Sequence, residues 1–528
     1  MRISTQQYFE ASTAKYQSNY SSLVKAQDQT TSGVRVQTAA DDPVAAARLL
    51  MLQQQKDMLG QFNGNIDTLT NSLNNENGVL DNLNDALQKA SELALQAGNI
   101  GISDADRKAL ADSIGSIQDQ VLGLLNTKDA SGNYMFSGSK TDTPPYTRNN
   151  DGTYTYQGDE TPLSLKVAEN LSISMGDTAK TILESSGNTG RTQATRVLTP
   201  PDVDDYKVTV SAGLITAGTT SSFASGQPYS LKFTSSTQYT VTDSAGKDVT
   251  SEIQGNGTFD ATKEGASTVN LRGVKFDIGF NLGEGVKPGA DSDALVKDRE
   301  FTLALKPDTF SVSRTPSNAT TAQLTGGTVT DQAAYASTFP NSGVVIKFGA
   351  GGSYNVYAQP YTADSKSIAN DTLAAGSTSI TVAGVQFAVT SDPGDGDQFT
   401  VGATSSKNEN VLDTLTHLRK VLETPADGNP AAQKELKDVV ARSIGNLANA
   451  KIQVGQVLGS VGARGAALTL QSTENTSLGI ANDSTMNSLG NIDLAEASIN
   501  LSLQQTMLQA SQLAFVKISQ LSPDHPRR

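Results

Sequence analysis

The chain contains no cysteine and no tryptophan, and histidine occurs only twice, as His417 and His525. Without cysteine there is no disulfide, no thiolate metal site and no cysteine nucleophile. Two isolated histidines do not form the His-Glu-x-x-His pair of a zinc protease, and no Ser–His–Asp set or phosphate-binding glycine loop stands out. We therefore predict a protein that is not an enzyme, with no catalytic residue, no metal site and no cofactor.

Clusters of basic residues and long apolar runs are also missing. The formal net charge is −14 at pH 7, whereas binding to a phosphate backbone requires lysine and arginine. No apolar run approaches the roughly 18 residues of a membrane helix, and the first residues lack the apolar core of a signal peptide. The sequence argues against nucleic-acid binding, membrane insertion and a cleaved signal peptide.

The most regular feature is a predicted long helix from Thr38 to Ala97. Asp41 and Asp42 suit a helix N-cap, and Pro43 suits the first helical position because the missing N–H has no partner there. Apolar residues then alternate in steps of three and four, with Glu76 as one polar interruption. This spacing predicts a coiled-coil seam, made by Ile66, Leu69, Leu73, Glu76, Leu80, Leu83, Leu87, Ala90, Ala94 and Ala97.

A second seam near the other end of the chain has the same spacing, with Ser443 and Arg464 as polar breaks. Because a helix this long needs a partner, we predict a rod built from both chain ends, with the middle of the chain inserted at its tip. The second seam consists of Leu436, Val440, Ser443, Leu447, Ala450, Val454, Val457, Val461, Arg464 and Leu468.

Further helices are predicted around these two. Residues 1–40 form a weakly amphipathic helix that Gly33 ends, Ser103 caps a helix that packs back on the first, and another helix follows Lys407 up to a break at 425–430. The last helix, about 486–521, has one apolar stripe at Leu494, Leu501, Leu508 and Phe515 and a second at Ile499, Leu503, Ala510 and Leu513. A helix that is apolar on two sides must be buried on two sides, which predicts packing between subunits.

The middle of the chain is predicted to be β structure with many turns. A hairpin is indicated at 146–156, where two short runs flank Asn-Asn-Asp-Gly. Residues 231–241, 273–276 and 301–303 then match residues 346–356, 384–387 and 399–401. We predict two related β modules, at 200–310 and 311–402, with chance similarity in Gly- and Thr-rich sequence as the alternative.

Three stretches resemble the bacterial flagellin superfamily, and within it the hook-associated junction proteins that join the flagellar hook to the filament. The first is the turn into the long helix, where Asp41-Asp42-Pro43 has the junction-protein form and flagellin usually has Asp-Asp-Ala. The second and most specific runs from Asn133 to Tyr146. The third is the C-terminal helix from Leu494. The motif positions are Asp41, Asp42, Pro43, Tyr134, Phe136, Ser137, Gly138, Pro144 and Pro145.

The resemblance covers about 1–146 and 410–521 and implies an α+β multidomain fold. It divides the chain into terminal helices of an inner tube (1–40 with 486–528), a coiled-coil rod (41–145 with 408–485), a connector (146–199) and the β modules. The expected coiled-coil and assembly residues are Ile66, Leu69, Leu73, Leu80, Leu83, Leu87, Leu447, Val454, Val457, Val461, Leu494, Leu501, Leu508 and Phe515.

The resemblance also implies a function and partners. We expect a structural subunit, exported by the flagellar type III route, that self-assembles into a ring and contacts flagellin, an adjacent hook-associated protein and an export chaperone. One departure is the polar, proline-containing end of the chain, 523–528, where the family usually has apolar residues. The alternatives are flagellin itself, or a glycan- or Ca²⁺-binding surface module, for which Asp392, Asp395 and Asp397 form a candidate loop.

Overall fold

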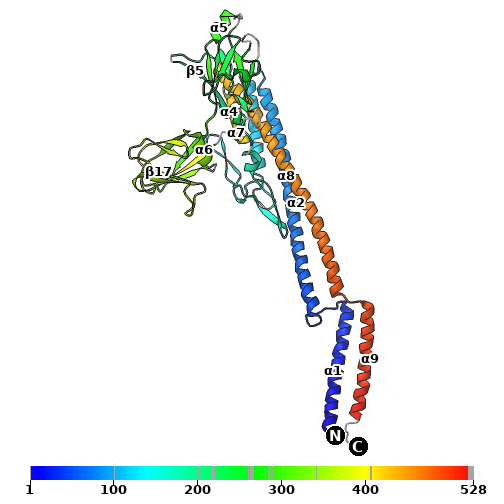
Figure 1. The fold of residues 1–528 in the computed structure, drawn as a ribbon. Helices are drawn as coiled ribbons and strands as arrows, with labels where there is room; N and C mark the ends of the chain where they lie inside the picture. The colour runs from blue at the N-terminus through cyan, green and yellow to red at the C-terminus, as the bar shows by residue number, and fades with distance from the viewer. Residues whose placement is uncertain are drawn as a thin grey trace. The chain divides into compact units, whose positions relative to one another are not determined.

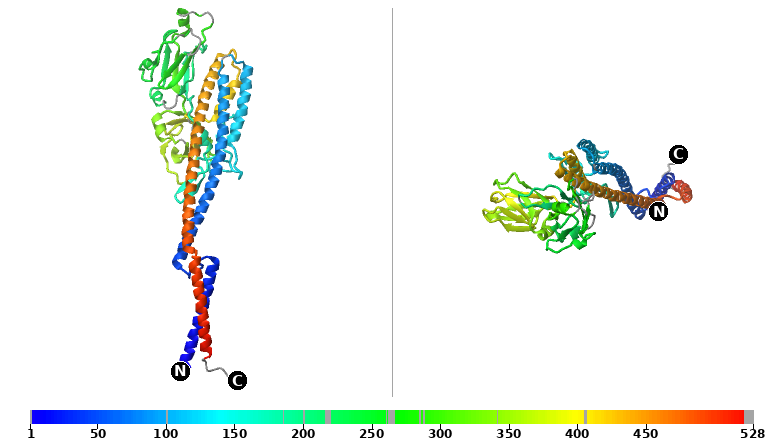
Figure 2. Two further views of the ribbon diagram at one scale, coloured as in Figure 1. Left: turned by 90° about the vertical axis from the view of Figure 1, so that its right-hand side faces the viewer. Right: turned by 90° about the horizontal axis from the view of Figure 1, so that it is seen from above.

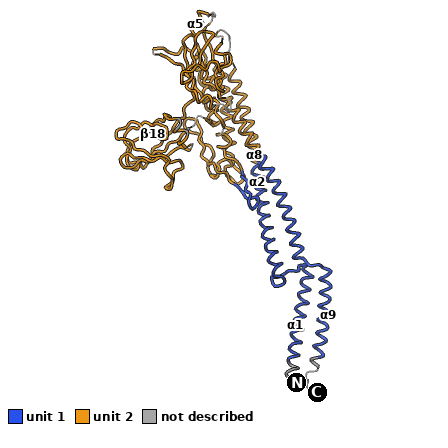
Figure 3. Tube along the Cα trace, viewed as in Figure 1, with its two compact units in different colours: residues 1–74, 164–175, 462–528 blue, residues 75–163, 176–461 orange. Residues whose placement is uncertain are grey.

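The computed structural model describes residues 2–99, 101–184, 186–199, 201–215, 220–259, 261, 267–283, 286, 289–340, 342–404 and 407–520. The polar end at 523–528 lies outside these residues. The chain forms two compact units (Figure 3): unit 1 comprises 1–74, 164–175 and 462–528, and unit 2 comprises 75–163 and 176–461. Two helices, α2 (Pro43–Ala97) and α8 (Pro430–Gly490), contribute a part to each unit.

Unit 1 contains the two terminal helices, α1 (Arg2–Ser32) and α9 (Leu494–Gln520). They lie side by side and antiparallel (Figure 1), because Phe9 contacts Phe515 with ring centroids 5.4 Å apart while Val34 bridges Asn491. Gly33 ends α1 in the left-handed conformation with φ 71°, as the sequence predicted. Its N–H donates to the carbonyl of Gln29 at 2.9 Å, which is a standard helix end.

The paired long helices run antiparallel in each unit. In unit 1 the Lys56 ammonium lies 2.8 Å from the Asp483 carboxylate, and in unit 2 the Lys451 ammonium donates to Gln88. Helix α2 begins at Pro43, the first helical position that the Asp41-Asp42-Pro43 signal predicted, and residues 38–42 of the predicted stretch lie before it. One predicted boundary needs a correction. Helix α8 continues to Gly490, so the helix expected from 486 begins only at Leu494.

Two shorter helices, α3 (Asp104–Leu125) and α7 (Val411–Glu423), pack against each other in unit 2. Ser103 caps α3 by accepting the backbone N–H of Asp106 at 3.2 Å, as the sequence predicted. Asn410 caps α7 in the same way, accepting the N–H of Leu412 at 2.9 Å. The α3 pairing is reinforced by the largely buried Arg107, whose guanidinium lies 2.5 Å from the Asp427 carboxylate, in the turn between α7 and α8.

Between α3 and the β modules lie two small hairpins and one short helix. The predicted hairpin is present, with Tyr146 opposite Tyr156 and Arg148 opposite Tyr154. The second hairpin belongs to unit 1 and packs on the long helices there, because Asn65 donates to the Lys166 carbonyl at 2.7 Å. The elements are β1 (Tyr146–Arg148), β2 (Tyr154–Tyr156), β3 (Ser164–Ala168), β4 (Leu171–Ser174) and the π-helix η1 (Lys180–Glu184).

The first β module packs two antiparallel sheets around an aromatic core that includes Phe223, Phe233 and Phe276. One sheet has the order β5-β12-β8-β9, and the other has β10-β11-β6 with β7 also paired to β11. Its strands are β5 (Thr192–Val197), β6 (Val208–Val210), β7 (Leu214–Ile215), β8 (Tyr229–Phe233), β9 (Tyr239–Thr242), β10 (Ser267–Leu271), β11 (Val274–Phe280) and β12 (Glu300–Leu305), and its helices α4 (Thr220–Ala224), η2 (Thr250–Glu252) and α5 (Ala290–Val296).

The second β module also packs two antiparallel sheets, around Phe348, Phe387 and Phe399. The orders are β13-β20-β15-β16-β17 and β14-β19-β18. Figure 2 shows the modules in green to yellow. The elements are β13 (Thr309–Arg314), β14 (Leu324–Val329), α6 (Gln332–Thr338), β15 (Val344–Phe348), η3 (Ala350–Gly352), β16 (Ser353–Ala358), β17 (Ala369–Thr372), β18 (Ser379–Val382), β19 (Val385–Val389) and β20 (Gln398–Thr404).

The two modules share the order of four strands in one sheet and of three in the other, with β7 added in the first module and β17 in the second. The matched sequences fall at equivalent positions. Phe233 pairs with Tyr239 as Phe348 pairs with Tyr354. The tight turns before β11 and β19 also agree, because Arg272-Gly273 has φ 47° and 84° and Ala383-Gly384 has 46° and 82°. Strand β5 was expected in the connector, but it pairs along its length with β12 and is part of the first module. The second module likewise begins before 311, with β13.

The carboxylate of Asp397 holds a loop of the second module in place. The side chain is completely buried, and it accepts the backbone N–H groups of Ala319 at 2.8 Å and Gly394 at 2.9 Å and the hydroxyl of Thr320. Burial alone raises the pKa of Asp397, but these hydrogen bonds outweigh it and hold the pKa below its ordinary value. Asp397 is therefore ionised and structural.

We expect Asp397→Ala to destabilise the second module by about 3 kcal/mol, because it leaves buried donors without an acceptor. Hydrogen exchange of peptides from β15 and β20 in the full chain would then be roughly 100-fold faster. Asp395→Ala is the matched control, because Asp395 lies in the same loop with an exposed side chain. Equal exchange in the two variants would contradict this role for Asp397.

Candidate assembly surfaces and a polar junction

The predicted seam residues form the cores of the helical parts within the chain. All of them are buried except Leu436 and Arg464, which are half-buried, so the seams are not a surface available to neighbouring subunits. On α2 they are Ile66, Leu69 and Leu73 in unit 1 and Leu80, Leu83 and Leu87 in unit 2; on α8 they are Leu447, Val454, Val457 and Val461. The coiled-coil part of the prediction therefore agrees with their burial.

Two of the three polar interruptions of the seams, Glu76 and Arg464, bind backbone groups. Glu76 is only 1% exposed, and its Oε1 accepts the N–H of Asp177 at 2.9 Å. Arg464 donates from Nη1 to the carbonyl of Ser174 at 3.4 Å. Glu76 thus fastens Asp177 to α2 in unit 2, and Arg464 fastens Ser174 to α8 in unit 1, whereas the hydroxyl of Ser443 is buried without a hydrogen-bond partner among the described residues. Spacing alone located these breaks but gave no sign of their partners, which are distant in the sequence.

One face of the C-terminal helix α9 packs against the rest of the chain, and another face is exposed to solvent. Leu508 is buried and Phe515 is half-buried against Phe9 and Tyr16 of α1. Leu501 is half-buried, whereas Leu494 is exposed, and Ala497 takes the buried position near the start of the helix. Of the four residues of the predicted first stripe, Leu501, Leu508 and Phe515 are therefore at least half-buried, and Leu494 is not.

The second stripe of α9 is open in the single chain. Ile499 is 72% exposed, Leu503 55% and Leu513 66%, and Ala510 is exposed as well. A two-helix pair leaves most of its apolar surface in water, because each helix has only one neighbour. We call Ile499, Leu503, Ala510 and Leu513 the open stripe. It is an extended apolar surface of the kind that marks protein–protein contact.

A further exposed stripe on α2 was missed in the sequence. Val44, Met51 and Met58 lie seven residues apart and are 80%, 68% and 48% exposed. Val44 and Met58 each stand one position before a buried residue of α2, Ala45 and Leu59, and Met51 stands before the half-buried Leu52. The heptad spacing is visible in the sequence, but the prediction used only the stronger seam that begins at Ile66.

The Asp41-Asp42-Pro43 motif organises the link between α1 and α2. The Asp41 carboxylate accepts the N–H of Thr38 at 2.8 Å, and its hydrogen bond with Lys25 lowers the pKa of Asp41 to about 2. Asp42 is the N-cap, since its Oδ1 accepts the N–H of Ala45 at 3.0 Å. An open cavity of about 460 Å³ lies beside this link, lined by Val34, Val36, Gln37, Thr38, Ala39, Ala46, Leu49, Leu50, Gln53, Met486, Asn487, Gly490 and Asn491.

The Tyr134–Tyr146 motif forms a compact turn in unit 2. Phe136 and Ser137 are buried, and the Lys128 ammonium lies 4.5 Å from the ring centre of Tyr134. Gly138 has φ 70°, and a Cβ there would lie 2.3 Å from the carboxylate of Asp159, so this position requires glycine. Pro144 and Pro145 lead directly into β1. The motif residues are therefore structural.

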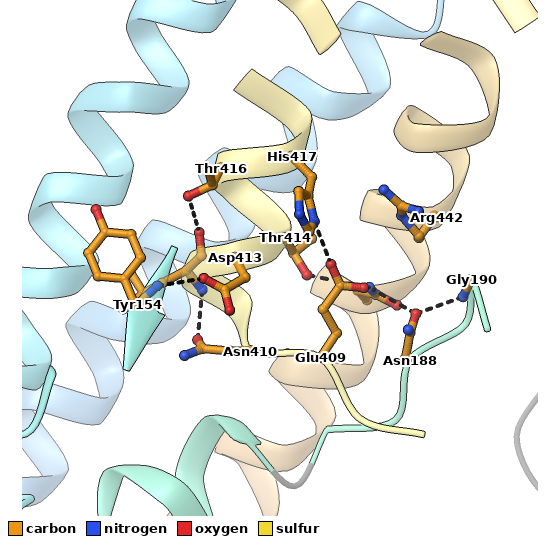
Figure 4. A network of polar contacts seen from close by, with 12 residues as sticks. Tyr154, Asn188, Gly190, Glu409, Asn410, Asp413, Thr414, Thr416, His417 and Arg442 are labelled. Atoms are coloured by element: carbon orange, nitrogen blue, oxygen red, sulfur yellow. Dashed lines mark hydrogen bonds and ion pairs between the residues drawn. The ribbon is translucent and has the colours of Figure 1, made fainter. Parts of the chain in front are cut away.

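A polar junction lies where the chain enters and leaves the β modules (Figure 4); we define it as Asn188, Glu409, Asp413, His417 and Asn446. Asn446 of α8, 1% exposed, donates to Glu409 Oε2 at 3.0 Å. His417 Nδ1 lies 2.9 Å from Glu409 Oε1, and an ionised carboxylate can only accept, so the ring donates. Asp413 Oδ1 accepts the N–H of Tyr154 at 2.8 Å.

The pKa values of the two carboxylates of the polar junction are shifted in opposite directions. Burial, reinforced by the negative charges of Glu409 and Asp151, raises the pKa of Asp413 to about 6. Burial also acts on Glu409, but the hydrogen bond from His417 and the positive charge of Arg442 outweigh it and hold the pKa of Glu409 below its ordinary value. This separation of two neighbouring carboxylates was not visible in the sequence, because it depends on which elements surround them.

The candidate Ca²⁺ loop is not supported by the geometry. Asp397 points into the module core and is occupied by backbone donors, while Asp392 accepts the N–H of Gly376 at 2.9 Å. Among the residues that the structure describes, no group of three His, Asp or Glu side chains is placed to hold a metal ion. In the same part of the chain, no helix combines the length and apolarity needed to cross a membrane.

Comparisons with known proteins agree on one family. Residues 3–141 match the family model for the bacterial flagellin N-terminal helical region. Flagellar hook-associated protein 3 of Salmonella typhimurium is 32% identical over 185 residues, which are 35% of this chain and 57% of that protein. Flagellin of Bacillus subtilis is 29% identical over 129 residues, 24% of this chain and 42% of the relative. The resemblance to the flagellin superfamily is confirmed.

A solved structure, the flagellar hook-associated protein-3 of Legionella pneumophila, is 20% identical with a TM-score of 0.47, covering 83% of this chain and 98% of the other. The chain spans little more than half of the length of the hook-associated protein from Salmonella, 57%.

Proposed function

We propose that this chain is a structural subunit of the bacterial flagellum, of the hook-associated type that joins the hook to the filament. The observation that carries the proposal is the 32% identity over 185 residues to a flagellar hook-associated protein 3. The Asp41-Asp42-Pro43 turn and the Tyr134–Tyr146 motif support it, since both have the junction-protein form.

The open stripe supports a role in polymerisation. Fully burying a leucine or isoleucine contributes about 1.5–3 kcal/mol, and Ile499, Leu503 and Leu513 are more than half exposed in the single chain. Neighbouring subunits that cover these side chains would stabilise the terminal helices, because binding stabilises the folded state by mass action. The terminal helices would then reach full stability only in the assembled ring.

The same physical argument bears on partners. Terminal segments with little stability of their own are suited to pass an export channel in an unfolded state, where an export chaperone would hold them. After assembly, one edge of the ring would contact an adjacent hook-associated protein and the other flagellin. The location that follows is the extracellular part of the flagellum.

A second candidate function is flagellin itself. The observation that favours it is the 29% identity over 129 residues to the flagellin of Bacillus subtilis. That match covers less of this chain than the hook-associated match, and the proline at position 43 is the junction form.

Deletion of the gene, followed by electron microscopy of the cells and immunoblotting of the medium for flagellin, tests the proposal. For a junction protein we expect bare hooks with flagellin released into the medium, because filament subunits are exported but have no junction on which to polymerise. Bare hooks without any flagellin would make the chain the filament subunit. Normal filaments would overturn both functions.

A further inference from the structure

Both crossings between the helices and the β modules meet at the polar junction. On entry, the N–H of Asn188 donates to the carbonyl of Lys407 at 2.8 Å, and Gly187 bridges Asn408. Asn446 then fixes this connector, because its Oδ1 accepts the Thr189 N–H at 2.8 Å and hydroxyl at 2.9 Å. The position of the entering and leaving strands is thus set by one side-chain cluster.

Glu409 lies just before Asn410, the N-cap of α7, and Asp413 and His417 lie in the first turns of this helix, four residues apart. That spacing places Asp413 and His417 on one helix face, and Glu409 joins them because its Oε1 lies 2.9 Å from His417 Nδ1. Glu409 faces α8 and the connector through Asn446, and Asp413 faces the β1–β2 hairpin through the N–H of Tyr154. The start of α7, with the residue before its N-cap, therefore links α8, the connector and the hairpin.

The charges around this face come from every element packed on it. Negative groups are Asp151 of the hairpin turn and Glu184 of η1, and positive groups are Arg442 of α8 and Lys306 after β12. His417 carries a charge only when protonated. With Asp413 neutral, Glu409 keeps its hydrogen bond with His417 and Asp413 adds no second negative charge beside it. With Asp413 charged, two neighbouring carboxylates repel each other in a partly buried site.

We propose that the polar junction is a proton-operated latch, which holds the hairpin and the two crossing strands against the helices in mildly acidic medium and loosens them toward neutral and alkaline pH. It acts on the attachment of the β modules and leaves the coiled-coil seams untouched. Proton uptake by a buried carboxylate favours the closed arrangement because it removes a charge that the site solvates poorly.

The direction and the pH window follow from linkage. The folded-state pKa of Asp413, about 6, lies above the ordinary value of 3.8, so its contribution is complete below pH 4 and is lost as the pH rises through 6. The pKa of Glu409 lies below its ordinary value, so its contribution is present above pH 4.5 and is lost on further acidification. The test therefore compares pH 5 with pH 7.5.

Hydrogen exchange of the full chain, corrected for the intrinsic effect of pH, measures the latch. We expect protection of peptides 150–157 and 186–191 to fall by roughly tenfold or more between pH 5 and pH 7.5, since each pKa unit corresponds to a factor of ten. In Asp413→Asn, which keeps an acceptor for the Tyr154 N–H, protection should remain high at both pH values. Protection of seam peptides such as 80–87 should not change with pH.

The matched control is Glu423→Gln on the same helix, whose carboxylate pairs with Arg419 near the other end; it should keep the full pH dependence. If Asp413→Asn does not fold, the unmodified chain still tests the proposal. Equal protection of both peptides at pH 5 and pH 7.5 overturns it. A pH dependence that persists unchanged in a folded Asp413→Asn also overturns it. The experiment uses the isolated chain, so its result does not depend on the flagellar role.

Discussion

Replacing Leu503 and Leu513 together by glutamate is expected to abolish incorporation into the flagellum while leaving the isolated chain folded. In the gene-deletion background, cells that make Leu503→Glu/Leu513→Glu should show bare hooks and no motility. The variant chain itself should be exported and recovered in the medium. Electron microscopy, a soft-agar motility assay and an immunoblot of the medium measure these three results.

The expected effect is large because the same contact would repeat in every subunit of the proposed ring. Both leucines belong to the open stripe and are 55% and 66% exposed, so the single chain loses little when they are replaced. A neighbouring subunit would lose about 1.5–3 kcal/mol for each leucine and would have to bury a charge in its place. Far-UV circular dichroism of the purified variant should match that of the unmodified chain.

The control is Gln505→Glu/Gln512→Glu, which adds the same two charges to the same helix on its polar side, where both glutamines are exposed. This control variant should assemble, and cells that make it should swim. If this control fails as completely as the leucine variant, charge rather than the apolar stripe is responsible. If the leucine variant assembles normally, the open stripe is not an assembly surface.

Asn446→Ala is expected to cause the largest loss of stability of any single polar substitution considered for this chain, about 3 kcal/mol or more. The change removes the acceptor of the Thr189 N–H and hydroxyl and the donor to Glu409 in one step. Each buried polar group left without a partner costs about 1–3 kcal/mol. Urea unfolding of the full chain, followed by hydrogen exchange of peptides 186–191 and 440–450, measures the loss.

Asn449→Ala provides the comparison one turn along α8. Its Nδ2 donates only to the carbonyl of Gly187, at 2.6 Å, and the side chain reaches solvent. Removal of one such bond should cost about 1 kcal/mol. A cost for Asn446→Ala no greater than that of Asn449→Ala would show that the polar junction contributes no more than an ordinary surface hydrogen bond.

The helical parts of the fold could be predicted because their determinants are local. A three-four alternation such as Leu80, Leu83 and Leu87 defines a buried face without knowledge of the partner. Ser103 and Gly33 mark helix ends through their own hydrogen bonds and dihedral angles. The turn at Asn149–Gly152 fixes the register of β1 and β2 in the same way. In each case a few adjacent residues contain the whole physical cause.

The polar contacts could not be predicted because their causes are distant in the sequence. Glu76 was visible as a break in a seam, but the Asp177 N–H that it accepts is set by the tertiary fold. Asn446 and Glu409 were not singled out, since neither residue type has a spacing rule when its partners lie on other elements. The start of α9 was placed too early because residues 486–490 are helical but belong to the end of α8, and the backbone turns at Asn491–Asp493 before α9 begins.

The hydrogen bond between Asn188 and Lys407 has a consequence for how the gene can vary. The segment between these residues begins and ends at one place, and it contacts α8 directly through Thr189 and through the N–H of Ala212, which donates to Asp438 at 3.0 Å. Apart from such contacts, it affects the helices as a closed loop. The entropy of closing a loop changes by only about 0.6 kcal/mol when its length doubles or halves. A natural or engineered graft of a shorter, longer or unrelated domain at this position should therefore leave the helical ends of the chain almost unaffected, provided that the two flanking strands keep their pairing.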